Sequence, residues 1–303
     1  MVLDLRSALL GTHKEQFPQK RRQLSTGLTL LNLLLTGDCS YGIESGSVVW
    51  LSGPSDSGRT TVGLTLLAEA TQTVDFVNYR LYYNNTEGQD VNIGAYFGNN
   101  VAARIRAVQC SDAMAFWEGM RQRGGRSIYF LDSLDGLLND TWQINNAYAK
   151  DVFDRVRETD SILIIAAQEK LAGDKRVTAG GFAMPFYADY SIKTIHSGSI
   201  VRVIRGKERV LGTNTTLSAI KSKIGIKGAV SVPAPIFSGS GYDNAESLFM
   251  FLRRKGVITG TNEYYHFSEF GFEGKFSSLL NDIRQFESMI ASWVESRVSE
   301  LLV

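Results

Sequence analysis

Apolar and polar positions along this chain follow a helical period in some stretches and a strand period in others. In residues 24–46, Ser25 and Thr26 offer helix N-caps, and the leucines that follow them predict a buried helix that ends near Gly37. An apolar, β-rich run at 48–51 then enters a glycine-rich turn, and the apolar residues after Thr60 have helical spacing. The pattern therefore predicts a helix, a strand and a second helix.

Between residues 80 and 167, short β-like runs alternate with helical ones. The expected strands are 80–84, 105–110, 127–132 and 161–167, and the expected helices are 112–121 and 147–157. Strands that alternate with helices of about ten residues are typical of a parallel sheet covered by helices. Ligands of such sheets bind at the carboxyl ends of the strands.

Beyond Ala188 the β pattern continues without helices, in ADYSIKTI, SIVRVIRG and TTLSAIKSK. Loops at HSG and KERVLGTN predict hairpins that extend the sheet with antiparallel strands. Residues 232–241, rich in Pro, Gly and Ser, predict a domain boundary. After it we expect a helix at 245–255, a β-like hairpin, and one last helix from about 277, with a packing face of Leu279, Ile283, Phe286, Ile290 and Trp293.

The N-terminal residues 2–10 have apolar positions at helical spacing and precede a basic tract at 13–22. A helix this short is not stable alone in water, so it is expected to pack on its own core or on a neighbouring subunit. The tract itself fits a solvated linker or a DNA contact. Three parts are predicted: an N-terminal helix with basic linker (1–23, polymerisation), an α/β core (24–237) and a small α+β C-terminal domain (238–303).

Composition narrows the possible classes of protein. With 44% hydrophobic and 21% charged residues, the chain has the composition of a soluble globular protein. A net charge of +1 excludes a uniformly basic nucleic-acid coat, so any such contact needs a local basic surface. Two cysteines, Cys39 and Cys110, are too few for a disulfide framework, and no spacing indicates zinc. Neither a membrane span nor a secretory leader is expected, which favours an intracellular protein.

The turn after the strand at 48–51 has the spacing G-x-x-x-x-G-K-[ST], with Arg59 in the lysine position. Gly53 and Gly58 permit backbone conformations that turn several N–H groups toward one anion, and the helix dipole adds positive charge there. Thr60 occupies the position of the Mg²⁺-binding hydroxyl. An ordinary strand-to-helix turn is the alternative. The predicted phosphate cradle consists of Gly53, Pro54, Ser55, Asp56, Ser57, Gly58, Arg59, Thr60 and Thr61.

Three polar side chains follow predicted parallel strands and would share the edge of the sheet with this turn. Asp132 ends the strand at 127–132, where its carboxylate can reach a Mg²⁺ held by Thr60. Glu87 follows the strand at 80–84, where a carboxylate can polarise a water that attacks a γ-phosphate. Gln168 follows the strand at 161–167, where an amide can sense that phosphate. The alternatives are a strand cap for Asp132 and plain loop positions for Glu87 and Gln168.

Basic residues form two further candidate groups. The glycine-rich stretch 169–185 contains Lys170, Lys175 and Arg176, and a long basic loop suits contact with a phosphate backbone. Lys221 and Lys223 alternate along a strand and so share one face. The alternatives are a plain surface loop and a charged edge that discourages aggregation. The lysine pair could also reach an anion on an adjacent subunit.

These residues together resemble the RecA recombinase family, and within it the phage UvsX-like branch. The resemblance covers nearly the whole chain, and its most specific part is TAGGFAMPFYAD, which is similar to the family's second DNA-binding loop. Further matching stretches are LSTGLTLLNLLLTGDCSYGIESG, LYYNNTEG, IYFLDS, KSK, FLRRKGVI, YYHFSEFGFEGK and WVESRVSELL.

The resemblance implies a RecA-like P-loop NTPase core, ATP and Mg²⁺ as cofactors, and a DNA-dependent ATPase that forms helical filaments on single-stranded DNA. Duplex DNA would enter during strand exchange, in the cytoplasm of a bacterial or phage-infected cell. It further implies that Glu87 is the catalytic glutamate, that Asp132 binds Mg²⁺, and that Gln168 couples the γ-phosphate to the DNA loop. DNA contacts would come from Lys170, Lys175, Arg176, Gly180 and Gly181, and ATP contacts across the subunit interface from Lys221 and Lys223.

Three departures from the family pattern matter. The guanidinium of Arg59 is planar and bulkier than an ammonium, which predicts ATP binding with slower hydrolysis. The segment between Asp132 and Gln168 is short, and LNDTWQINN is the only remnant of a first DNA-binding loop. The nearest candidates for an adenine-stacking residue are Ile93 and Tyr96. Two alternatives follow: a RecA paralog that binds ATP without efficient hydrolysis and acts as a mediator or filament cap, and a structural filament protein that does not use DNA.

Overall fold

The computed structural model describes residues 21–88, 91–137, 146–172, 175–178, 183–222, 230–261 and 264–302. Several predicted features lie outside these ranges. They are the helix at 2–10, most of LNDTWQINN, Gly180, Gly181 and Lys223.

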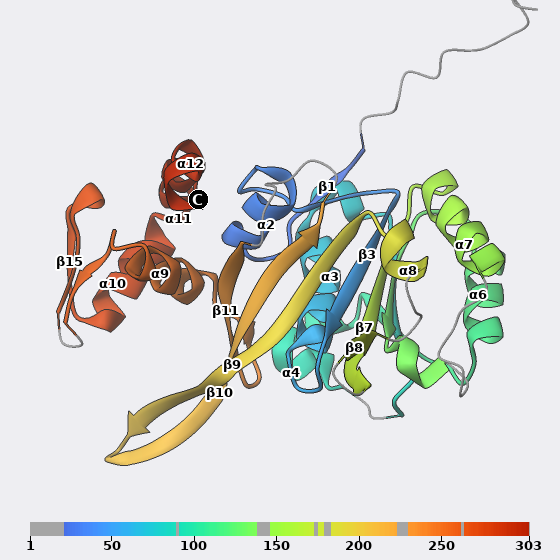
Figure 1. Cartoon of the computed structure of the whole chain (residues 1–303), viewed down its shortest axis with the longest axis horizontal. Coiled ribbons are helices and arrows are strands. Elements are labelled where there is room, and N and C mark those ends of the chain that lie inside the picture. The colour runs from blue at the N-terminus through green and yellow to red at the C-terminus, as the bar shows by residue number, and fades with distance from the viewer. Residues whose placement is uncertain are drawn as a thin grey trace, which may run out of the picture.

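One large mixed sheet organises the described residues (Figure 1). Its central strand is β3 (Ser47–Gly53), which pairs in parallel with β7 (Ile162–Ala172) on one side and β9 (Tyr190–Ile204) on the other. Beyond β7 the parallel strands are β6 (Ser127–Asp132), β4 (Arg80–Asn85) and β5 (Ile105–Gln109). Beyond β9 the strands are antiparallel: β10 (Lys207–Lys221), β11 (Ser231–Phe237) and β12 (Gly241–Tyr242).

Helices cover both faces of this sheet (Figure 1). On β3, Val49 and Leu51 face one hydrophobic core, and Val48 and Trp50 face the other, as the two-residue period of a strand requires. The first core includes α2 (Thr29–Thr36) and α3 (Arg59–Gln72), and the second includes α6 (Ala113–Gln122), α7 (Asn146–Glu158) and α8 (Ala183–Tyr187). The predicted fold class, a parallel sheet extended by antiparallel strands with helices on both faces, is confirmed.

The start of α2 differs from the prediction. The helix begins at Thr29, and its N-cap residue is Leu28, whose side chain makes no capping hydrogen bond. The Thr29 N–H instead donates to Asn244 Oδ1 at 2.9 Å, from a segment more than two hundred residues away in the chain. Ser25 and Thr26 are therefore not the N-caps, because a tertiary contact supplies the acceptor. The predicted end is confirmed, since Gly37 is the C-cap residue.

The β region after Ala188 is one long hairpin, so the predicted breaks at HSG and KERVLGTN are wrong. Both segments lie inside β9 and β10, and the turn is at Arg205 and Gly206, which both have positive φ. This is the conformation that tight hairpin turns require. Register shifts within the pair accommodate the glycine and asparagine residues that suggested loops. The hairpin extends well beyond the rest of the sheet (Figure 1).

The passage at 232–241 is largely part of the sheet. Pro233 and Pro235 lie in β11, and β12 pairs only with Ile236 and Phe237, so β11 is an edge strand where the prolines occur. Helix α9 (Asn244–Arg254) packs against β11. The predicted boundary between residues 237 and 238 falls at the end of β11, and the division into domains stays a prediction.

The C-terminal region contains a small antiparallel sheet and three short helices. Its strands are β13 (Thr259–Gly260), β14 (Tyr265–Phe267) and β15 (Phe272–Gly274). The single predicted helix is wrong, because the chain forms α10 (Phe276–Gln285), α11 (Glu287–Ser296) and α12 (Val298–Leu301). Leu279, Ile283 and Ile290 are fully buried as expected, whereas Phe286 stands at the break and is 37% exposed.

Two segments that follow strands of the sheet contain elements that the sequence pattern did not predict. The segment after β4 forms two helices, α4 (Ile93–Phe97) and α5 (Asn99–Ala102). The glycine-rich stretch begins as a hairpin, because β7 runs to Ala172 and β8 (Lys175–Thr178) pairs back with it.

Among the described residues, no helix is both long enough and apolar enough to cross a membrane.

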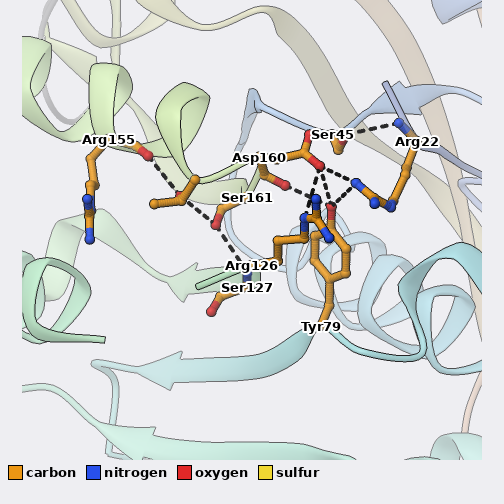
Figure 2. A network of polar contacts seen from close by, with 9 residues as sticks. Arg22, Ser45, Tyr79, Arg126, Ser127, Arg155, Asp160 and Ser161 are labelled. Carbon is orange, nitrogen blue, oxygen red and sulfur yellow. Dashed lines mark hydrogen bonds and ion pairs between the residues drawn. The ribbon is translucent and has the colours of Figure 1, made fainter. Parts of the chain in front are cut away.

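The amino ends of the parallel strands are joined by a polar network centred on Asp160 (Figure 2). One carboxylate oxygen accepts from Ser45 Oγ at 2.5 Å, and the other accepts from Tyr79 Oη at 3.1 Å and from Arg22 Nη1. Arg126 adds an ion pair at 3.4 Å. Because Arg22 lies at the start of the described chain, this network fixes that segment against the amino ends of β3, β4, β6 and β7.

Candidate functional site

The turn between β3 and α3 is shaped by two glycines. Gly58 has φ of 89°, and a Cβ there would lie 2.5 Å from Ile236 Cδ1. A Cβ on Gly53 would lie 2.3 Å from Thr194 Oγ1. Neither position can accept a side chain without displacing its neighbours. Both glycines are therefore needed for the backbone conformation that connects β3 to α3.

Thr60 and Asp132 meet at the centre of this edge. The Thr60 hydroxyl donates to Asp132 Oδ1 at 3.2 Å, and the Tyr83 hydroxyl donates to Oδ2 at 3.1 Å. Burial, with a smaller contribution from the charge of Glu87, raises the pKa of Asp132 to about 6. The two hydrogen bonds and the charge of Arg59 act in the opposite direction. The sequence predicted the pairing of Thr60 with Asp132; it gave no signal for Tyr83.

Glu87 lies at the same edge and is held by the segment that follows β6. Its Oε1 accepts from Ser133 Oγ at 3.2 Å. The Thr86 hydroxyl accepts from the Ser133 N–H at 2.9 Å and donates to the Ser133 carbonyl at 2.7 Å. The peptide bond between Asp132 and Ser133 is cis. The hydrogen bonds between Thr86 and Ser133 tie the ends of β4 and β6 together, and Ser133 holds the Glu87 carboxylate near the end of β6.

Gln168 connects the glycine turn to β7. Its side-chain Nε2 donates to Ser55 Oγ, and its backbone N–H donates to Asp135 Oδ2 at 2.8 Å. Asp135, in the 3-10 turn Leu134–Leu137, also lies 4.0 Å from Arg59 Nη1. The sequence analysis missed Asp135, because an aspartate three residues after the strand's own carboxylate has no distinguishing local pattern.

A cavity of about 460 Å³ opens at this point, which is within the range of small-molecule sites. Tyr96, one of the two candidates for base stacking, lines it, whereas the buried Ile93 does not. Five lining residues were not predicted, because they come from segments that were interpreted as a hairpin loop and a linker. The lining is Ser55, Asp56, Ser57, Gly58, Arg59, Thr60, Thr61, Glu87, Tyr96, Gln168, Gly212, Thr213, Ile236, Phe237 and Ser238.

Of the predicted basic residues, the structure describes Lys221 and the backbone of three others. Lys221 is exposed, does not line this cavity, and donates from Nζ to the Phe186 carbonyl at 2.5 Å. Lys170, Lys175 and Arg176 belong to the backbone of the β7–β8 hairpin, which begins directly after Gln168. Lys223, Gly180 and Gly181 are outside the described residues.

The residues around the cavity fit a nucleoside triphosphate with Mg²⁺. Mg²⁺ is commonly held by one or two protein oxygens together with phosphate oxygens and waters, and the Thr60 hydroxyl and Asp132 carboxylate supply such a pair. Within the described ranges, no group of three or more His, Cys, Asp or Glu side chains could hold a metal unaided. Arg59 Nη1 is buried without a hydrogen-bond partner among the described residues, so a cationic donor is available for an anion.

Comparison with known proteins finds distant similarity to RecA proteins. The chain is 25% identical to Protein RecA of Rickettsia massiliae (strain Mtu5) over 207 residues, which are 60% of this chain and 57% of that protein. It is 24% identical to the plasmid Protein RecA of Lactococcus lactis subsp. lactis over 256 residues, which are 78% of this chain and 73% of that protein. The chain thus spans less than two thirds of the Rickettsia protein. No family model matches it.

Proposed function

We propose that this chain is a RecA-like recombinase of the phage UvsX-like branch, a DNA-dependent ATPase that forms helical filaments on single-stranded DNA. One observation carries the proposal: the glycine turn, Thr60, Glu87 and Gln168 line a single cavity, and Thr60 donates a hydrogen bond to Asp132. They do so at the carboxyl edge of the parallel sheet, where ligands of such folds bind. The distant similarity to RecA proteins supports the same reading.

ATP would occupy this cavity with its phosphates along residues 53–61 and its base against Tyr96. Bound Mg²⁺ would supply charge neutralisation on the β- and γ-phosphate oxygens. Thr60 and Asp132 would hold the ion, and the burial of Asp132 leaves that carboxylate better stabilised with a cation than without one.

Glu87 would orient the attacking water and take up its proton. Its Oε1 is held by the Ser133 hydroxyl, which leaves the second carboxylate oxygen available to a water. A general base must lie within hydrogen-bond reach of the proton that it takes, and Glu87 lines the cavity. Gln168 would sense the terminal phosphate, because its side chain already contacts Ser55 in the phosphate turn.

The DNA contact is proposed for the segment that begins at Gln168. A change in the position of Gln168 would be transmitted directly to the β7–β8 hairpin, since the residue belongs to β7. The proposed DNA-binding residues are Lys170, Lys175, Arg176, Gly180 and Gly181. Contacts between basic side chains and phosphates release counterions, so replacing Lys175 and Arg176 by alanine is expected to flatten the salt dependence of single-strand binding.

Filament assembly would place Lys221 and Lys223 against the nucleotide of the next subunit. The exposed position of Lys221, away from the cavity of its own chain, agrees with a contact in trans. The segment 1–23 would contribute to polymerisation, and residues 238–303 would form a small C-terminal domain. The complex would assemble in the cytoplasm of a bacterial or phage-infected cell.

Phosphate release, measured with and without single-stranded DNA, tests the proposal. Turnover that DNA stimulates, together with DNA-dependent filaments in electron micrographs, is the expected result. A chain that forms filaments with ATP but binds no oligonucleotide would instead be a structural filament protein.

Arg59 favours one second candidate, a RecA paralog that binds ATP without efficient hydrolysis and acts as a recombination mediator or filament cap. The guanidinium is partly buried and lies 4.0 Å from the Asp135 carboxylate, so it cannot act as the freely placed, compact charge of a lysine. ATP binding without DNA-stimulated phosphate release would support this accessory role.

A further inference from the structure

Arg59 and Asp135 form a partly buried pair beside the cavity that is matched in charge but not joined by a hydrogen bond. The two groups are 4.0 Å apart, and their side chains are only 11% and 14% exposed. Arg59 Nη1 and Asp135 Oδ1 are both buried without a hydrogen-bond partner in the part of the chain that the structure describes. Buried charges with open hydrogen-bonding capacity carry an uncompensated desolvation cost, so either group would gain from a new partner.

Asp135 is the fixed member of this pair. It lies between Leu134 and Leu137, which are both buried in the second core. Its Oδ2 also accepts the Gln168 N–H at 2.8 Å, which ties the carboxylate to β7. Arg59 has a long side chain with several rotatable bonds. A change of partner in this pair would therefore be a movement of the guanidinium, not of the carboxylate.

We propose that Asp135 competes with nucleotide phosphates for Arg59 and thereby sets the affinity of the site for di- and triphosphates. The inference rests on the proposed function, because it takes the ligand to be a nucleotide. Without ligand, Asp135 partly neutralises Arg59. A phosphate offers charge-assisted, bidentate hydrogen bonds to the guanidinium and would draw it away. Nucleotide binding would therefore cost the attraction between Arg59 and Asp135, and this cost weakens binding.

The basic residue of this motif reaches the β- and γ-phosphates, so the competition concerns only nucleotides that carry them. Nucleoside monophosphates would bind without involving Arg59. Asp135 would therefore reduce the margin by which the site prefers ATP over AMP. The carboxylate is a specificity-determining residue that acts through Arg59, not a catalytic one.

A double-mutant cycle in the full chain tests the proposal through nucleotide affinity. Asp135→Asn removes the charge and keeps an acceptor for the Gln168 N–H. With Arg59 present, the variant is expected to bind fluorescent ATP and ADP with Mg²⁺ about tenfold more tightly, the size of one charge attraction that binding no longer has to break. In the Arg59→Ala background the same change should give less than about a twofold effect. Binding of AMP should not respond in either background.

Equal tightening in both backgrounds would overturn the proposal, because it would show a general field effect and no competition for Arg59. Asp56→Asn is the matched control: Asp56 lines the same cavity and has φ of 58°, which asparagine tolerates, and no ion pair joins it to Arg59 among the described residues. Its effect should be the same with and without Arg59.

Urea unfolding of the ligand-free variants gives a second readout. Asp135→Asn leaves Arg59 buried without its counter-charge, so the unfolding midpoint should fall, and this loss should disappear in the Arg59→Ala background. An unchanged midpoint with Arg59 present would count against the pair. If the parent chain binds no nucleotide at all, the proposed function fails, and the unfolding cycle still decides whether Asp135 and Arg59 are coupled.

Discussion

Asp160 and Asp132 lie at opposite ends of the same parallel sheet, and their surroundings differ. Both carboxylate oxygens of Asp160 are engaged, and two arginines, Arg22 and Arg126, balance its charge (Figure 2). Asp132 is more deeply buried and receives two neutral hydroxyl donors, while no ion pair reaches it among the described residues. One carboxylate is compensated within the chain, and the other is not.

The difference separates polar groups that are satisfied within the fold from polar groups that a ligand could satisfy. A satisfied network stabilises the native chain, whereas an uncompensated buried charge lowers stability and is retained where binding repays the cost. The contrast concerns charged groups: the hydroxyls of Ser47 and Ser127, near the Asp160 end, also have no partner within the described ranges. At the carboxyl edge, Arg59 and Asp135 balance each other in charge, but Arg59 Nη1 and Asp135 Oδ1 have no hydrogen-bond partner among the described residues.

The largest expected effect comes from removing the Asp132 charge. Asp132→Asn should weaken Mg²⁺-dependent ATP binding by at least on the order of 100-fold, because the negative charge of the proposed Mg²⁺ ligand is lost. The same variant should unfold at a higher urea concentration without ligand, since an uncompensated charge is gone. Calorimetric titration and urea denaturation measure the two effects. Unchanged ATP affinity would contradict the assignment of Asp132 to the metal.

The pH dependence of ligand-free stability is the second test. Burial raises the pKa of Asp132 from 3.8 to about 6, so the folded chain binds more protons than the unfolded chain between these values. The ionisation of Asp132 should therefore lower the free energy of unfolding as pH rises through this window. The loss should be zero at pH values below the window and should reach about 3 kcal/mol at pH values above it. Urea titrations of the parent chain and Asp132→Asn at several pH values should converge at the acid end. A constant difference across the window would contradict the raised pKa.

At the other end of the sheet, Asp160→Asn should lower stability by about 2 kcal/mol, a value reduced for the partial exposure of the pair. Asparagine tolerates the φ of 54° at this position, so the backbone is not the cause. ATP affinity should stay unchanged, which separates this network from the cavity. Urea denaturation and nucleotide titration measure the two outcomes. A loss of ATP affinity as large as the loss of stability would contradict the separation of this network from the cavity.

Two buried tyrosines sharpen the contrast at the smallest scale. Tyr79→Phe removes a hydroxyl that donates to Asp160 and should cost about 1 kcal/mol of stability. Tyr83→Phe removes the hydroxyl that donates to Asp132 and helps to lower its pKa. The midpoint of Mg²⁺-dependent ATP binding should then move to higher pH. A shift of that midpoint in Tyr79→Phe would be unexpected, because Tyr79 lies at the other edge of the sheet.

Much of the carboxyl edge could be predicted because parallel strands end together. The positions of Asp132, Glu87 and Gln168 after β-like runs were sufficient to place them at one edge with the glycine turn. Asp135 and Ile236 could not be found in the same way. Asp135 depends on the path of a short turn, and Ile236 comes from a proline-containing strand that resembles a linker in sequence.

By itself, the sequence determined the alternation of strands and helices, the glycine turn and the acids that follow the strands, since each depends on residues close together in the chain. Only the tertiary structure decided that Asn244 completes the first turn of α2, that the last helix is broken at Phe286, and that Asp135 lies beside Arg59. These features depend on contacts between distant segments. Local periodicity carries no information about which distant atom meets a given donor or charge.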